Sequence, residues 1–270
     1  MNSKDLTEEE LEVGRKTKVA LSVGAAGAAA WAASKAIIRP TARPSKRALH
    51  FEGPIVIQQL SGSTSIEQAA EAAALGVQGL SMSVRLTADE EIILTDSTLS
   101  ESVHCLLKDM LERYPHLLFL IRLVDSPDTY EGSLMPSKLW KLLEECDAQN
   151  QVAVISHYDE QVDRFNLYTQ HLAAVGAGAE ELKQAYAAYS SRFGHLYNPR
   201  TDLFVMSDKI GPFQPASVGF IQFLKKLNVS VYIDNAEFDD VLKLAHAGAA
   251  GFITDSPKTV MSQLDTLHEQ

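Results

Sequence analysis

Apolar and polar residues recur along the chain in two periods, and together they predict strands alternating with helices from about residue 54 onward. Short apolar runs such as "IVIQQ" at 55–59 and "LLFLIRL" at 117–123 are typical of buried strands. Amphipathic stretches such as "SKLWKLLEECDAQ" at 137–149 follow them with helical spacing. About seven or eight such units over some 215 residues predict an α/β fold, a closed (β/α)8 TIM barrel.

Two segments depart from this regular order. Residues 77–100 predict a strand, a tight turn at 88–90 and a second strand. Residues 159–200 predict a helical and loop region that is longer than a usual barrel connection and adds a helix the barrel does not require. Its aromatic residues recur at spacings of three and four, which favours packing onto the barrel over an interface anchor. These residues are Tyr186, Tyr189, Phe193 and Tyr197.

The stretch "VALSVGAAGAAAWAASKAII" at 19–38 carries Lys35 as its only charge. At 1.5 Å per residue it is long enough to cross a bilayer core of about 30 Å. Because alanine contributes little transfer free energy, a packed helix is the alternative. The small residues Ala20, Gly24 and Ala28 are suited to close contact with another membrane helix.

The segment that follows, "RPTARPSKRALHFEGP" at 39–54, has three prolines and no hydrophobic period, which is typical of a linker. Basic residues flank the apolar stretch on both sides, so its orientation stays open. We expect a single-pass membrane protein, and the membrane itself is undecided, with the mitochondrial inner membrane as one candidate. The expected parts are a polar segment at 1–18, a transmembrane helix at 19–38, a linker at 39–53 and a barrel at 54–270.

Composition narrows the classes of partner. The 270 residues are 46% hydrophobic and 22% charged, as in ordinary soluble domains, and the net charge is −11. Lys and Arg outnumber Asp and Glu in the first 47 residues, so the remainder is strongly acidic and disfavours nucleic acid. Cys105 and Cys146 stand far apart in segments that look helical, which predicts neither a disulfide framework nor a metal–thiolate site.

Candidate binding residues stand where the predicted strands end, because a barrel places its chemistry there. Arg122 either grips a phosphate or carboxylate or pairs with Asp96 or Asp234, and both interpretations stay open. For His157 a hydrogen-bonded wall position is favoured over catalysis, since no second base is predicted to face it. Asp96 and Asp255 are expected to cap the helices that follow rather than to bind a cation. The residual ligand contacts are expected from Arg122, His157 and Tyr232.

Two stretches carry a resemblance to a known family. They are "ALGVQGLSMSVRLTADEEIILTDSTL" and "LNVSVYIDNAEFDDVLKLAHAGAAGFITDSP". The first is similar to the Leu-Gly-Ala-Asp-Gly-Ile-Glu-Leu-Asp-Val segment of the glycerophosphodiester phosphodiesterases, a branch of the phospholipase-C-like phosphodiesterases, through to its His-Asp-x-x-Leu. The second resembles the closing Val-x-Val-Trp-Thr-Val-Asn and Gly-Ile-Ile-Thr-Asp-x-Pro. The resemblance spans about residues 55 to 267 and implies the same TIM barrel.

The family's catalytic residues are replaced at the positions that the resemblance aligns. Its His-Arg pair falls on Gln59 and Leu60, and its Glu-x-Asp metal ligands fall on Ser81 and Ser83. Its acid/base His falls on Thr95, its third-strand Glu falls on Leu120, and its nearby Lys is Arg122. A divalent cation needs several charged oxygen ligands, and acid/base catalysis needs a group that titrates near neutrality. We therefore expect no bound metal, no cofactor and no catalytic residue at these positions.

Two classes of function follow. The first is a membrane-anchored pseudoenzyme that serves as a scaffold or accessory subunit of a membrane complex, with other membrane-protein subunits as partners. The second is a divergent glycerophosphodiester or phospholipid phosphodiesterase, or a module that binds lipid head groups. The sequence favours the first, because every proton-transfer and metal position is replaced while the scaffold is kept.

Overall fold

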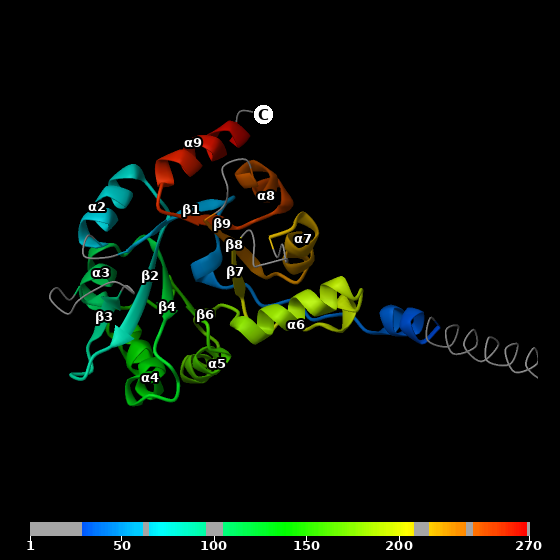
Figure 1. Ribbon diagram of the computed structural model, residues 1–270, viewed down its shortest axis with the longest axis horizontal. Coiled ribbons are helices and arrows are strands. Elements are labelled where there is room, and N and C mark those ends of the chain that lie inside the picture. The colour runs from blue at the N-terminus through cyan, green and yellow to red at the C-terminus, as the bar shows by residue number, and fades with distance from the viewer. Residues whose placement is uncertain (1–28, 62–64, 96–104, 208–215, 236–239, 269–270) are drawn as a thin grey trace, which may run out of the picture. The chain divides into compact units, whose positions relative to one another are not determined.

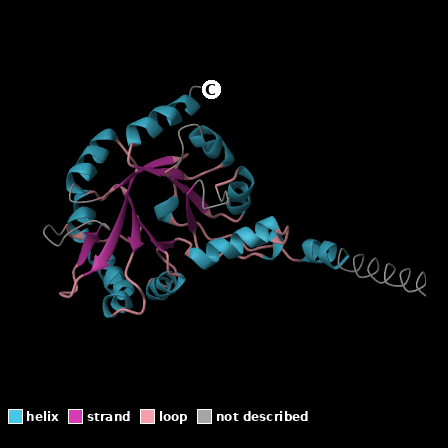
Figure 2. Cartoon of the chain, in the orientation of Figure 1, coloured by secondary structure: helices cyan, strands magenta, loops and turns pink. Residues whose placement is uncertain are grey.

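The computed structural model describes residues 29–61, 65–95, 105–207, 216–235 and 240–268. The chain divides into two compact units, 1–40 and 41–270. The second unit contains the barrel, and its strands form a ring that helices surround (Figures 1 and 2).

Eight parallel strands form the ring in the order β6-β5-β4-β2-β1-β9-β8-β7. Their bounds are β1 Ile55–Gln59, β2 Gly79–Leu86, β4 Leu118–Leu123, β5 Val152–Ser156, β6 Ala174–Val175, β7 Leu203–Ser207, β8 Ser230–Asp234 and β9 Gly251–Thr254. The seam between β6 and β7 is closed by a single bridge from Gly176 to Leu203, with the Ala177 amide donating to the Leu203 carbonyl at 2.9 Å. The predicted TIM barrel is confirmed.

Helices follow the strands and cover the outside of the ring (Figure 2). Their bounds are α2 Ser65–Leu75, α3 Leu107–Arg113, α4 Tyr130–Glu145, α5 Asp159–Tyr168, α6 Ala179–Ser190, α7 Val218–Lys226, α8 Val241–Ala247 and α9 Pro257–His268, with short 3-10 helices η1 Arg47–Leu49 and η3 Gly194–Leu196. Helix α7 illustrates how an amphipathic helix packs there, since it buries Phe220, Ile221 and Leu224. The helix–strand boundaries use local signals, such as Gly248 at φ 103° after α8.

One strand of the ring lies where the sequence predicts only helix and loop. The region 159–200 contains β6, whose two residues Ala174 and Val175 pair with β5. The second strand of the predicted hairpin, β3 Ile92–Thr95, pairs antiparallel with β2, as a hairpin requires, but it lies outside the ring. The end of β3 is therefore not one of the eight barrel-strand ends, and the end of β6 takes that place.

The interior of the ring is a closed apolar core. Inward-facing side chains come from alternate positions of the strands, as the pleat requires. They include Ile55, Ile57, Leu118, Leu120, Ala153, Ile155, Leu203, Tyr232 and Ile253. Gly251 allows β1 to approach closely, since a Cβ there would lie 2.7 Å from the Ile55 carbonyl oxygen and 3.0 Å from the Tyr232 ring. Ala48 of η1 joins the same core.

The linker predicted at 39–53 is wrong from Thr41 onward, because these residues pack on the barrel. Arg43 pairs with Asp202 at 2.7 Å, and the Asp202 side chain is only 2% exposed. The Asn228 amide donates to the Arg43 carbonyl at 2.7 Å. These contacts could not be predicted from the sequence pattern, because a segment that packs on the end of a barrel needs no hydrophobic periodicity of its own. The compact unit begins at Thr41, not at Pro54.

Half of the predicted membrane segment, residues 19–28, lies outside the described residues. Its described part is helical over 29–37, and the Lys35 ammonium lies 5.1 Å from the centre of the Trp31 ring. Within the described ranges no helix is both long enough and apolar enough to cross a membrane.

Candidate functional site

The positions that the resemblance assigns to catalysis lie side by side at the carboxyl ends of β1, β2 and β4. Gln59 is the register partner of Ser81, and Ser81 is that of Leu120 on its other side. Ser83 pairs with Thr95 of β3, which returns from the hairpin to the rim. The predicted grouping of these positions is therefore present, although Thr95 reaches it from a strand outside the ring.

These neighbouring side chains form a compact, uncharged wall, which we call the β1–β4 sector and define by Gln59, Leu60, Ser81, Ser83 and Leu120. Ser81 is 1% exposed and Leu120 is fully buried in the barrel core. The Gln59 amide donates to the carbonyls of Leu60 at 3.0 Å and Ser81 at 3.4 Å. The Gln59 amide is thus held by the backbone, and the sector offers a ligand no charged group.

Acidic and histidine side chains do not cluster on the described part of the chain. No group of three or more His, Cys, Asp or Glu residues there is arranged to hold a metal ion. Asp96, for which helix capping is predicted, lies outside the described residues. Asp255 is exposed and accepts no hydrogen bond from a described residue, and the Ser256 amide donates to the Thr254 hydroxyl at 3.0 Å. The expected capping role of Asp255 is therefore absent from these contacts.

Arg122 and Asp234 form the charged pair of the barrel mouth. The guanidinium of Arg122, at the end of β4, lies 4.0 Å from the carboxylate of Asp234, at the end of β8. Burial raises the pKa of Asp234, Arg122 opposes this shift, and Asp255 adds to it. At 4.0 Å the contact is an ion pair without a hydrogen bond, so the Arg122 donors are left for water or a ligand.

His157 and Tyr232 differ in their access to the mouth. His157 follows β5 and is exposed, with its ring 5.8 Å from that of Tyr158 in an edge contact. Its ring makes no hydrogen bond to a described residue, contrary to the wall position expected for it. Tyr232 is fully buried in the barrel core, and its hydroxyl has no partner among the described residues. The side chain of Tyr232 therefore lies beneath the mouth and does not line it.

A cleft of about 850 Å³ opens on the other side of the mouth. The polar and charged residues that line it at the strand ends are Arg122, Ser156, His157, Ser207 and Asp234, and α6 adds Glu180, Lys183 and Ser190. Its apolar part runs along the ends of β5, β6 and β7 and the facing side of α6, and is lined by Ile155, Ala177, Ala179, Leu182, Tyr186, Ala187 and Val205. We call these apolar residues the β5–β7 sector.

Helix α6 is fixed in place by buried polar contacts. Glu181 is 1% exposed, and its carboxylate accepts hydrogen bonds from the Tyr197 hydroxyl at 2.5 Å and from Arg200 Nε at 2.8 Å. Asp159 accepts from the Glu180 and Glu181 amides at the start of α6. Burial, followed by the Glu181 hydrogen bond, raises the pKa of Tyr197. These contacts hold one wall of the cleft in a fixed position.

The aromatic residues of region 159–200 pack as predicted, mostly onto α7. The rings of Tyr186 and Tyr189 each lie 5.4 Å from that of Phe220, and the Tyr197 ring lies 6.0 Å from Phe223. Phe193 is 44% exposed. Tyr186 also lines the cleft, a role that its spacing did not indicate.

The β5–β7 sector is a candidate binding surface that the sequence pattern did not predict. The signal that was available is the run "VGAGAEEL" at 175–182, where small residues follow a very short apolar strand. Small side chains at a strand end leave space at the barrel mouth, and this signal is separate from the groups that titrate.

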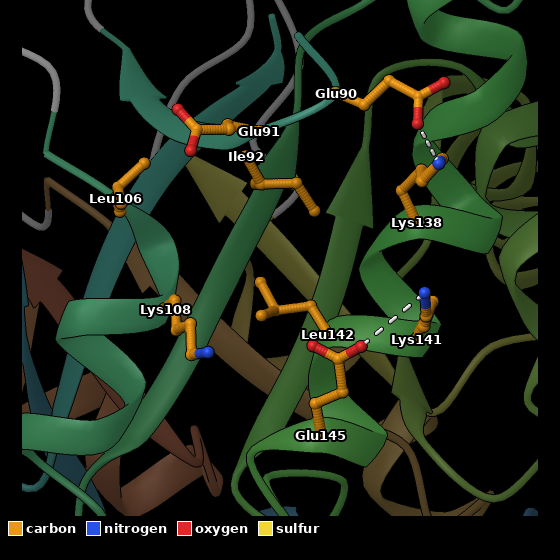
Figure 3. A pocket seen from close by; sticks show the side chains of 9 residues that line it. All are labelled: Glu90, Glu91, Ile92, Leu106, Lys108, Lys138, Lys141, Leu142 and Glu145. Carbon is orange, nitrogen blue, oxygen red and sulfur yellow. Dashed lines mark hydrogen bonds and ion pairs between the residues drawn. The ribbon is translucent and has the colours of Figure 1, made fainter.

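A second, smaller cavity of about 230 Å³ lies between the β2–β3 hairpin, α3 and α4 (Figure 3). Lysines and glutamates from these elements surround Leu142 there. Lys138 pairs with Glu90, Lys141 lies 3.8 Å from Glu145, and Lys108 lies 3.9 Å from Glu112. Because each ammonium already has an acidic partner, this cavity has the properties of a solvated surface.

No protein-family model matches the sequence, and no curated protein matches it by sequence. Solved structures match it by fold. A glycerophosphodiester phosphodiesterase from Parabacteroides distasonis superposes with a TM-score of 0.64 at 14% identity, over 81% of this chain and 100% of the other. The enzyme from Agrobacterium tumefaciens superposes with a TM-score of 0.58 at 11% identity, over 77% of this chain and 99% of the other. The enzyme from Thermotoga maritima superposes with a TM-score of 0.56 at 13% identity, over 80% of this chain and 100% of the other.

These matches agree with the barrel that the strands form. They cover nearly the whole of each solved structure and most of the unit that begins at Thr41. The chain has the fold of the glycerophosphodiester phosphodiesterases.

Proposed function

We propose that this chain is a catalytically inactive protein built on the glycerophosphodiester phosphodiesterase fold, and that it binds a phosphate-bearing ligand at the barrel mouth. The observation that carries the proposal is the uncharged β1–β4 sector. The neighbouring positions on which the resemblance places metal ligands are Ser81, Ser83 and Leu120, and two of them are buried against the barrel core. A serine hydroxyl and a leucine do not supply the formal charge that Mg²⁺ or Ca²⁺ requires.

Binding is assigned to the charged end of the cleft. Arg122 presents planar guanidinium donors that match a phosphate, and its only ion pair to a described residue is the 4.0 Å contact with Asp234. The cleft volume of about 850 Å³ lies within the usual range for small-molecule sites. The geometry thus supports ligand binding more directly than a purely structural role.

A hydrolysis assay and a metal titration test the proposal. The full-length protein is incubated with a glycerophosphodiester and millimolar Mg²⁺ or Ca²⁺, with the Thermotoga maritima enzyme as the positive control. We expect no turnover and no change in melting temperature on adding the ion. A bound ion at a hundredfold over its dissociation constant would add about 2.7 kcal/mol. Metal-dependent hydrolysis that Ser81→Ala abolishes would overturn the inactive assignment.

The proposal includes membrane attachment through residues 19–38, with other membrane-protein subunits as partners of an accessory protein. It is supported by the length of this apolar stretch and its single charge. Carbonate washing of membranes that contain the full-length protein tests it. Retention in the membrane fraction, and loss of retention when 19–38 are deleted, are expected. Release by carbonate alone would contradict a single-pass anchor.

A further inference from the structure

The cleft is lined by both charged and apolar side chains. At the strand ends the guanidinium of Arg122 faces Asp234, and Ser207 is the register partner of Asp234. Ile155, the register partner of Arg122, and Val205, two residues before Ser207, form the apolar floor beside this pair. Leu182 and Tyr186 on α6 add an apolar wall. A charged pair beside an apolar helix face is complementary to an amphiphile.

One face of α6 forms the groove and the opposite face anchors the helix. The cleft residues Leu182, Lys183, Tyr186, Ala187 and Ser190 recur at spacings of three and four. The residues buried on the other side are Glu181 and Ala185. Since α6 has 12 residues, this face is about 16 Å long. A groove along one helix face is suited to a single extended chain.

Small side chains keep the groove open. Ala177 and Ala179 lie where β6 leads into α6, and Ala187 lies one helical turn beyond Lys183. Gly178 between them is required by its neighbour, because a Cβ there would lie 2.7 Å from the Asp159 carboxylate. The three alanines contribute methyl groups to the lining, so a large side chain at one of them would fill the groove.

The pairing of the cationic side chains indicates which end of the cleft binds an anion. Lys183, on α6, already pairs with Glu180 at 2.6 Å. Arg122 has only the longer contact with Asp234, and its guanidinium forms no hydrogen bond with the described part of the chain. The cation that is available for an anionic head group is therefore at the strand ends, and an attached chain would extend along α6.

We propose that the cleft binds a single-chain phospholipid, with its phosphate on Arg122 and its acyl chain along the β5–β7 sector. This inference rests on the proposed binding of phosphate at the mouth and specifies the ligand. Burying apolar chain surface favours binding in proportion to the area removed from water. The chain, rather than the head group, is therefore the main source of affinity.

Binding measurements on the full-length protein test the two ends separately. The probes are a palmitoyl lysophosphatidylglycerol below its micelle concentration, glycerophosphoglycerol as the head group alone, and palmitate as the chain alone. We expect the lysophospholipid to bind at least tenfold more tightly than either of the other probes. Equal affinity for palmitate would overturn the assignment of the phosphate to Arg122.

Substitutions test the acyl-chain part and the head-group part of the site separately. Ala187→Trp and Leu182→Gln should remove the gain from the acyl chain and leave head-group affinity unchanged. Arg122→Gln should weaken both lysophospholipid and head group at least fivefold. The matched control is Ala70→Trp, at an exposed position of α2 outside the cleft, and it should change neither affinity. Thermal melting of each variant checks that it is folded.

The outcomes distinguish this inference from the proposed function. Head-group binding without a gain from the acyl chain would overturn the inference and leave the proposed function standing. A gain that persists in both Ala187→Trp and Leu182→Gln would also overturn it. If neither the lysophospholipid nor the head group binds, both the inference and the proposed ligand binding fail.

Discussion

The two sides of the barrel mouth are built in opposite ways. In the β1–β4 sector, strand pairing is extensive, the side chains are uncharged, and the Gln59 amide donates to backbone carbonyls. In the β5–β7 sector the seam between β6 and β7 is a single bridge, and the wall is a helix fixed by buried charges. The first sector is closed, and the second is open to a ligand.

This difference shows that a binding surface can form away from the positions at which the resemblance to the phosphodiesterases places the catalytic residues. A buried leucine at position 120 extends the barrel core upward and removes the space that a metal site would use. The short β6 and its small residues leave space on the opposite side. The following substitutions test whether the stability and ligand binding of the open sector depend on the side-chain contacts described above.

The largest effect is expected from Arg43→Ala. Asp202 is buried, accepts hydrogen bonds from Arg43 and from the Val175 amide, and so joins the amino-terminal segment to the β6–β7 seam. Removing Arg43 leaves this carboxylate without its counter-ion, which should lower the free energy of unfolding by about 3 kcal/mol. Urea unfolding measures it. Arg47→Ala, at an exposed position of the same segment, should change it by less than about 0.5 kcal/mol.

A loss below about 1 kcal/mol for Arg43→Ala would contradict the assignment of residues 41–53 to the barrel. It would also show that the single bridge between β6 and β7 is sufficient to close the ring.

The next effect is expected from Glu181→Ala, which removes the acceptor of Tyr197 and Arg200. The Tyr197 hydroxyl is left buried without a partner, whereas Arg200, which is half exposed, can be hydrated. The free energy of unfolding should fall by about 2 kcal/mol, and hydrogen exchange of the α6 amides should accelerate. Glu180→Ala, which removes only a surface pair, should lower it by about 0.5 kcal/mol or less.

Unchanged exchange of α6 in Glu181→Ala would show that apolar packing alone fixes this helix. The contrast between the two sectors would then rest on shape, not on buried charge.

Much of the fold was predictable because hydrophobic periodicity marks most of its strands and helices. Seven of the ring strands coincide with apolar runs, such as Val152–Ser156, that length and turn residues delimit. Strand β6 could not be found in this way because it has two residues, and its place in the ring is fixed by pairing with β5. The contacts of Thr41 to His50 were hidden for a similar reason, since single side chains such as Arg43 make them.

For the site, the sequence predicted which positions meet but not where the space lies. Register placed Gln59, Ser81 and Leu120 together as the resemblance implied. The pairing of Arg122 with Asp234, one of the alternatives left open, is present in the structure. The cleft depends on which side chains are small and on how α6 is fixed, and neither property follows from hydrophobic periodicity.

A smaller effect is expected from Asp234→Asn, which tests the charged pair of the mouth. Burial raises the pKa of Asp234, so its contribution to stability is fully present below the unfolded pKa and is lost as the pH rises through the folded value. At neutral pH the carboxylate competes with an anionic ligand for Arg122. Asp234→Asn should therefore tighten head-group binding about threefold at neutral pH.

The wild-type protein should show the same gain as the pH falls through the raised pKa of Asp234, and the variant should lose that pH dependence. Calorimetric titration at several pH values measures both. Weaker binding by Asp234→Asn would mean that the carboxylate itself contacts the ligand, for example by accepting a hydrogen bond from a head-group hydroxyl.

A change in stability at most, with no change in affinity, is expected from Tyr232→Phe, at a strand position between the two sectors. Tyr232 points into the core two residues before Asp234, and its hydroxyl is buried without a partner among the described residues. Burial alone raises the pKa of this phenol. Because an unsatisfied hydroxyl costs free energy, removing it should leave stability unchanged or raise it by about 1 kcal/mol. Ligand affinity should not change. A loss of stability together with weaker lysophospholipid binding would instead make Tyr232 a ligand contact and extend the open sector across β8.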